Sequence, residues 1–220
     1  MNIKLREPGS AITHFIGIVL GILAMPPLLM RAASNPDKTH FIALSVFIIS
    51  LIMLYSASTI YHSLDISEKI NRILRKMDHI MIFYLIAGSY TPVCLIVLNG
   101  TFGITLLSIV WGIAIFGTII KACWITCPKW FSSVLYIAMG WLVVIAFGPI
   151  IHALPAMGLF WLVAGGVLYT IGGVIYAFVA KSFNERHPNF GTHEIFHLFV
   201  LAGSICHYIM MYSYVALMPI

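Results

Sequence analysis

The chain has 220 residues, of which 61% are hydrophobic and only 9% are charged. This composition excludes a soluble globular domain and is typical of a protein that lies almost wholly within a membrane. The formal net charge of +5 does not call for a nucleic-acid partner, because the basic residues gather on one side of the predicted membrane spans.

Seven apolar runs follow one another along the chain, each long enough for a membrane helix. The hydrocarbon core of a bilayer needs about 20 apolar residues per helical span. The connections are short, so no residues remain for a soluble domain. We therefore predict an all-α polytopic membrane protein with seven transmembrane helices in a single domain, residues 1–220. The runs are Ala11–Met30, Phe41–Tyr61, Asp78–Leu98, Phe102–Lys121, Phe131–Ile151, Met157–Ala180 and His193–Leu217.

The first run has one alternative interpretation. Lys4 and Arg6 followed by apolar residues could mimic a cleaved secretory signal. The run lacks a convincing small-residue cleavage site, and Pro26-Pro27 with Arg31 fits the end of a retained span better. We therefore expect the first run to remain as a transmembrane helix.

The basic residues predict how the spans are oriented. Connections between successive spans alternate sides, and only Arg31 and Lys38 fall on the side opposite the N-terminus. By the positive-inside rule, the N-terminus is cytoplasmic and the C-terminus external, in the cell inner (plasma) membrane. The ten residues on the predicted cytoplasmic side are Lys4, Arg6, Lys69, Arg72, Arg75, Lys76, Lys121, Lys129, Lys181 and Arg186.

The last predicted span opens with two histidines, in the segment His193-Glu-Ile-Phe-His197. Residues four apart lie one turn apart on the same face of a helix, a spacing with which one helix can supply two ligands to a zinc ion. Two interfacial histidines that hydrogen-bond to neighbouring groups are the structural alternative. The pair by itself does not decide between these interpretations.

Other spans bring further polar residues to the same predicted side. His62 closes the second run with Ser58 one turn before it, and Asp78 opens the third run. Asp78 has two structural alternatives, a carboxylate favoured by a helix dipole or an ion pair with Arg75. Because polar side chains in hydrocarbon are costly, their coincidence favours a metal site. Three histidines with a water in the fourth position, and carboxylates held nearby, are typical of catalytic zinc.

These motifs together resemble the hemolysin III family, the bacterial branch of the adiponectin and progestin receptor (PAQR) superfamily. The matching elements are Ser-x3-His at Ser58–His62, Lys-Met-Asp at Lys76–Asp78, Ala87–Pro92 with the sequence Ala-Gly-Ser-Tyr-Thr-Pro, and His-x3-His at His193–His197. The resemblance covers about Glu7 to Tyr212. It implies a seven-helix fold with Zn²⁺ near the cytoplasmic face, held by His62, His193 and His197. It further implies that Asp78 holds the zinc-bound water and that Ser58 supports the site.

The segment that begins at His193 also satisfies H-E-x-x-H, the zinc-metalloprotease helix in which Glu194 would be the general base. We expect Glu194 instead to lie at the helix start, facing the cytoplasm or neighbouring polar groups. It stays open as a second candidate base. Elsewhere, His14 is a candidate for the surroundings of the metal, while His79 points roughly 100° away from Asp78 around a helix. His207 lies about 15 Å deeper than His197, so we expect an interhelical hydrogen bond there.

Three functions remain open from the sequence. The leading hypothesis is a zinc-dependent hydrolase of an amide or ester bond in a membrane lipid, because proteins similar to this fold include alkaline ceramidases. In that case Asp78 and Ser58 would be the catalytic residues. The alternatives are a non-catalytic membrane sensor, receptor-like or hemolysin-like protein with structural zinc, and an intramembrane protease. The expected partner is a membrane lipid.

Overall fold

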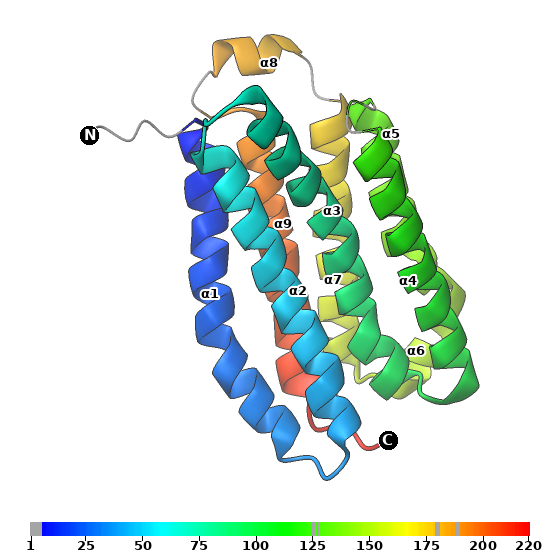
Figure 1. Ribbon diagram of the computed structural model, residues 1–220. Coiled ribbons are helices and arrows are strands. Elements are labelled where there is room, and N and C mark those ends of the chain that lie inside the picture. The colour runs from blue at the N-terminus through cyan, green and yellow to red at the C-terminus, as the bar shows by residue number, and fades with distance from the viewer. Residues whose placement is uncertain (1–5, 125, 127, 179–180, 188–189) are drawn as a thin grey trace.

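The computed structural model describes residues 6–124, 126, 128–178, 181–187 and 190–220. In that part of the chain seven helices are long and apolar enough to cross a membrane, which confirms the all-α, seven-span prediction. They form an elongated bundle, with the start of α1 at one end and the C-terminus at the other (Figure 1). The spans consist of α1 (Pro8–Ala33), α2 (Lys38–Ser63), α3 (Glu68–Pro92) continued by the π-helix η1 (Val93–Val97), α4 (Gly100–Cys123), α5 (Lys129–Gly140) continued by the 3₁₀-helix η2 (Trp141–Ala146) and α6 (Phe147–Ala153), α7 (Ala156–Phe178), and α9 (Thr192–Met210) continued by the π-helix η3 (Met211–Val215). A short helix, α8 (Lys181–Arg186), lies at the end of the bundle where α1 begins.

Local polar groups set where several helices begin. The Asp37 carboxylate accepts a hydrogen bond from the Thr39 backbone N–H at 2.8 Å, which starts α2 and lowers the pKa of Asp37. The Ser67 side chain caps α3 in the same way through the backbone N–H of Ile70. Such caps satisfy N–H groups that a helix leaves unpaired in its first turn. Between the third and fourth spans, Asn99 and Gly100 both have positive φ, 36° and 59°, as the tight turn there requires.

Helices α2 and α3 are the most buried spans, and large side chains such as Phe47, Tyr55 and Phe83 are fully enclosed around them. Glycine lets neighbouring helices approach closely: a Cβ at Gly88 would collide with the Ser50 side chain of α2. Apolar residues on the outer faces, such as Leu23 at 67% exposure, point away from the bundle. Such a surface is stable in hydrocarbon and not in water.

The third span differs from its sequence prediction in one respect. We expected Asp78 to open it, but α3 begins at Glu68, and Asp78 lies well inside the helix. The sequence placed the start at the first long apolar run, whereas the helix also includes the polar segment with Lys69, Arg72 and Arg75, capped by Ser67. A helix dipole favours a carboxylate only within the first turn of the helix, and Asp78 lies beyond that turn. The helix dipole therefore does not explain the position of Asp78.

The orientation of the bundle in the membrane remains a prediction from the charge distribution. A topology reporter fused after Ile220 should report an external position, because the sequence assigns ten of the twelve basic residues to the predicted cytoplasmic side. A fusion after Trp124, at the other end of α4 from Asn99, should report a cytoplasmic position and serves as the matched control. A cytoplasmic signal from the Ile220 fusion would reverse the proposed sidedness of every residue discussed below.

Candidate metal centre

Three histidines from two helices converge near the end of the bundle where α1 begins. One ring nitrogen from each of His62, His193 and His197 lies within 4.8 Å of the other two. His62 is fully buried, His197 is buried, and His193 is partly exposed. The predicted ligands thus meet at the end of α2 and the start of α9, and the cluster could hold one metal ion.

A carboxylate just before α1 orients the His62 ring. Glu7 Oε2 accepts a hydrogen bond from His62 Nδ1 at 2.6 Å, and the Glu7 backbone N–H donates to the His62 carbonyl at 2.9 Å. Because a carboxylate accepts, Nδ1 carries the hydrogen and Nε2 presents a lone pair. That Nε2 is buried and has no hydrogen-bond partner in the described part of the chain. A buried nitrogen without a partner is unfavourable, and a metal ion would satisfy it.

Glu7 faces two of the three histidines. Besides its hydrogen bond with His62, its Oε2 lies 3.9 Å from His193 Nδ1. The hydrogen bond from His62 lowers the pKa of the Glu7 carboxyl group, against the opposing effect of burial. A carboxylate on the far nitrogen of a ligand histidine is the usual way in which proteins fix that ligand's tautomer and direction. Sequence reasoning missed Glu7, although an acidic residue directly before Pro8, on the side of His62, was the available signal.

The His197 ring is held from α1. Its Nδ1–H donates to the Ser10 backbone carbonyl at 3.3 Å and lies 3.3 Å from the Thr13 hydroxyl, so Nε2 is again the atom left for a ligand role. The ring of His14 stacks on His197 with centroids 3.6 Å apart and an angle of 6° between the planes. His14 therefore lies directly behind a candidate ligand, as the sequence allowed.

Asp78 and Ser58 lie beside the histidines as predicted. Asp78 is 7% exposed and lines the same cavity as His193 and His197. Its Oδ2 lies 3.7 Å from His79 Nδ1, which donates its hydrogen to the Arg75 carbonyl at 2.8 Å. The fully buried Ser58 hydroxyl faces Asp78 but makes no hydrogen bond of standard geometry with the described residues. Asp78 thus presents its carboxyl group to the cavity while the histidines supply the candidate metal ligands.

The Glu194 side chain forms hydrogen bonds at the start of α9. Its Oε1 accepts from the Ser10 hydroxyl at 2.6 Å and its Oε2 accepts from the Gly191 backbone N–H at 2.8 Å. The second bond joins the side chain of the third helical residue to the backbone of the N-cap residue at the start of α9, and Gly191 has no side chain to form the reciprocal bond. Both carboxylate oxygens are therefore engaged in beginning α9 and tying it to α1, as expected for a residue at the helix start beside neighbouring polar groups.

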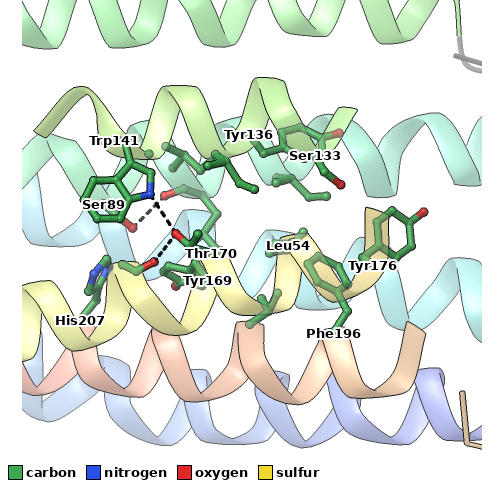
Figure 2. A pocket seen from close by; sticks show the side chains of 18 of the residues that line it. Leu54, Ser89, Ser133, Tyr136, Trp141, Tyr169, Thr170, Tyr176, Phe196 and His207 are labelled. Carbon is green, nitrogen blue, oxygen red and sulfur yellow. Dashed lines mark hydrogen bonds between the residues drawn. The ribbon is translucent and has the colours of Figure 1, made fainter. Parts of the chain in front are cut away.

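A largely apolar cavity of about 400 Å³ extends from the histidine cluster into the bundle. Figure 2 shows its length: Tyr176 and Ser133 lie toward one end, and Trp141 and His207 lie toward the other. His193, His197 and Asp78 also line it, so one cavity joins the candidate ligands to the bundle interior. A space with such walls suits an extended apolar group.

Fold and site together define a seven-span membrane protein with a buried three-histidine cluster at the head of an apolar cavity. The chain matches the family model described as Haemolysin-III related over residues 3–208, and it therefore belongs to that family.

Individual relatives agree with this assignment. Hemolysin-3 of Bacillus cereus is 38% identical over 199 residues, which cover 90% of this chain and 87% of the relative. The Hemolysin-3 homolog of Bacillus subtilis (strain 168) is 36% identical over 214 residues, covering 97% and 96%. An adiponectin receptor protein of Drosophila melanogaster is 26% identical over 222 residues, covering 92% of this chain and 49% of that protein. The resemblance to the PAQR superfamily is thus confirmed as a distant homology, and the seven candidate spans are those of a multi-pass membrane protein.

If the three histidines bind the metal, their substitution should change the metal content of the protein. Replacing His62, His193 or His197 by Ala should reduce the metal content of the purified protein, which we predict to be about one zinc per chain, and should lower its melting temperature. Metal analysis and thermal unfolding with and without added zinc measure both effects. A triple-Ala variant that retains full zinc content would show that the ion binds elsewhere.

The same measurements test the role of Glu7. Glu7→Gln removes the charge opposite His62 Nδ1 while preserving size, and should weaken zinc binding by about 10- to 100-fold. Glu185→Gln, on the exposed surface of α8, is the matched control and should leave binding unchanged. Equal zinc affinity in both variants would mean that His62 needs no carboxylate for its orientation.

Proposed function

We propose that this protein is a zinc-dependent hydrolase that cleaves an ester or amide bond of a membrane lipid at the cytoplasmic leaflet of the inner (plasma) membrane. The observation that carries the proposal is that His193 and His197 of the histidine cluster line one apolar cavity together with Asp78. A lipid chain in this cavity would have its polar end beside groups suited to hydrolysis. Family membership is consistent with this function.

Zinc is the proposed metal because three neutral imidazoles are a typical set of protein ligands for catalytic zinc. When bound, zinc supplies a water whose pKa is lowered to about 7 and polarises a substrate carbonyl group. His62 and His197 would hold it through Nε2, since Glu7 and Ser10 engage their Nδ1 atoms. The unpartnered Nε2 of His62 fits this assignment.

The remaining chemistry falls to Asp78 and its neighbours. Asp78 would accept the proton of the attacking water and return it to the leaving oxygen or nitrogen, the usual role of a carboxylate general base. Ser58 would orient the Asp78 carboxyl group, which its buried hydroxyl faces. The apolar wall would position the acyl chain and keep bulk water from the reacting carbonyl.

A second candidate is a membrane sensor or cytolytic protein in which the metal is structural. The names of the two Bacillus relatives, Hemolysin-3 and Hemolysin-3 homolog, favour it. In this case the histidine cluster would tie α2 to α9, and Asp78 would have no proton to transfer. The two candidates therefore differ in what Asp78 does once zinc is bound.

Asp78→Asn separates these candidates. The substitution preserves size but removes the proton acceptor, so it should retain most of the zinc and lower lipid hydrolysis by about 10²-fold or more. Ser58→Ala should have a smaller effect, since about one net hydrogen bond is lost. Release of fatty acid from total bacterial lipid by the zinc-loaded protein measures the rate.

Asp65→Asn is the matched control for this experiment, because Asp65 lies on the exposed loop between α2 and α3. It should hydrolyse lipid at the rate of the unsubstituted protein. A wild-type rate in Asp78→Asn would transfer the base role to another group. If the zinc-loaded unsubstituted protein releases no fatty acid, the structural-metal candidate takes precedence.

An intramembrane protease of the H-E-x-x-H type makes a different prediction for Glu194. Because both oxygens of Glu194 are engaged by Ser10 and Gly191, Glu194→Gln should lower the melting temperature while changing lipid hydrolysis less than the 10²-fold expected for loss of a general base. The melting temperature and the rate are measured on the same preparation. Cleavage of a membrane peptide that disappears in Glu194→Gln would instead establish the protease.

A further inference from the structure

The deep end of the cavity contains polar side chains that the proposed hydrolysis does not use. Ser89, Trp141, Thr170 and His207 line it, from α3, η2, α7 and α9. In Figure 2, His207 rises from α9 toward Ser89 and Trp141. By helix rise, His207 lies about 15 Å along α9 from His197. Polar side chains at such depth are costly in a membrane protein and generally serve a purpose.

The hydroxyl and indole donors in this group are engaged within the protein. Ser89 Oγ donates to the Leu85 carbonyl at 2.9 Å. Trp141 Nε1 donates to Thr170 Oγ1 at 2.9 Å, and Thr170 Oγ1 donates to the Gly166 carbonyl at 2.7 Å. Each hydroxyl oxygen nevertheless has lone pairs and can accept.

His207 adds an acceptor without a partner. Its Nε2 lies 3.3 Å from the Leu162 carbonyl, and because a carbonyl only accepts, Nε2 carries the hydrogen. Its Nδ1 therefore presents a lone pair, and this buried atom has no hydrogen-bond partner among the described residues. The ring has little freedom to turn, since it packs against Gly165 on α7 so closely that a Cβ there would collide with it. An unpaired acceptor atom is thus held in place on a residue that lines the deep end.

The fifth span is broken at the same level. The α-helix α5 ends at Gly140 and continues as the 3₁₀-helix η2, and Gly140 lines the cavity. The Tyr90 hydroxyl compensates the irregular backbone: it donates to the Gly140 carbonyl at 2.7 Å and accepts from the Val143 N–H at 2.6 Å. Irregular backbone at membrane depth is tolerated where it lines a cavity, and broken helices often mark binding sites.

We propose that the deep end of the cavity is a binding subsite for a hydroxyl group carried on the apolar chain of a lipid. The hydroxyl would donate to His207 Nδ1, with Ser89 Oγ as a second acceptor; both residues also line a small adjoining pocket. A carbonyl or ether oxygen on the chain has no hydrogen to donate to His207 Nδ1. The subsite therefore favours a chain that carries a hydrogen-bond donor. This inference rests on the proposed function, in which the cavity binds the chain of a lipid. The substrate class that it adds is lipids with hydroxylated acyl chains.

Binding of three matched fatty acids to the purified protein tests this subsite. Dodecanoate is the reference, ω-hydroxydodecanoate adds a donor at the far end, and ω-methoxydodecanoate places an oxygen there without a donor. Competition against a fluorescent fatty acid gives the affinities. The hydroxylated chain should bind about tenfold more tightly than either other chain, the scale of one hydrogen bond to a buried acceptor. Equal affinities for the hydroxy and methoxy chains would overturn the proposal, as would the absence of binding by any of the three.

Two variants locate the effect. His207→Phe keeps a ring but removes Nδ1, and Ser89→Ala removes only a hydroxyl; each should reduce the preference for the hydroxylated chain. His152→Phe, at an exposed histidine of α6, is the control and should keep the full preference. Unchanged selectivity in the Ser89 and His207 variants would show that the hydroxyl binds elsewhere. Because no turnover is measured, failure of the hydrolase proposal would leave these results unaffected.

Discussion

The hydrogen bond between Glu7 and His62 is the contact on which the arrangement of the site depends. It places a carboxylate from the start of α1 against the far side of a ring from α2, and so directs the Nε2 of that ring inward. Without it, a fully buried imidazole would have two unsatisfied nitrogens, and each such group costs about 1–3 kcal/mol. Ser10 fixes His197 in a comparable way. The start of the first helix therefore orients two of the three histidines through hydrogen bonds, although it supplies none of them.

The same end of α1 also determines where α9 begins. Glu194 accepts from Ser10 on α1 and from Gly191 on its own chain segment, so the start of α9 is tied to α1 by a side chain that also caps it. Since His193 and His197 lie in the first turns of α9, their position depends on this contact. The H-E-x-x-H spacing thus has a structural origin here: the glutamate sets the beginning of the helix that carries both histidines.

One wall of the cavity is formed by an interrupted helix. The fifth span changes from α-helix to 3₁₀-helix beside the cavity, and the Tyr90 hydroxyl satisfies backbone groups there. In hydrocarbon, every backbone polar group must be paired within the protein, so such a break persists only with a partner of this kind. The apolar walls suit a lipid chain, and in the proposed function the few polar groups at each end would supply its chemical selectivity.

The sequence by itself determined the seven spans, because bilayer thickness requires long apolar runs that are visible in one dimension. It also indicated the candidate ligands: His62 lies near the end of the second span and the His193–His197 pair opens the seventh. Because successive spans run in opposite directions, these two ends lie on the same side of the bundle. Only the tertiary structure decided the partners of these residues. The contacts of Glu7 with His62 and of Ser10 with Glu194 join distant segments through side-chain directions that helical periodicity does not encode. The start of α3 at Glu68 was likewise missed, because a polar helix extending beyond the apolar run has no hydropathy signal.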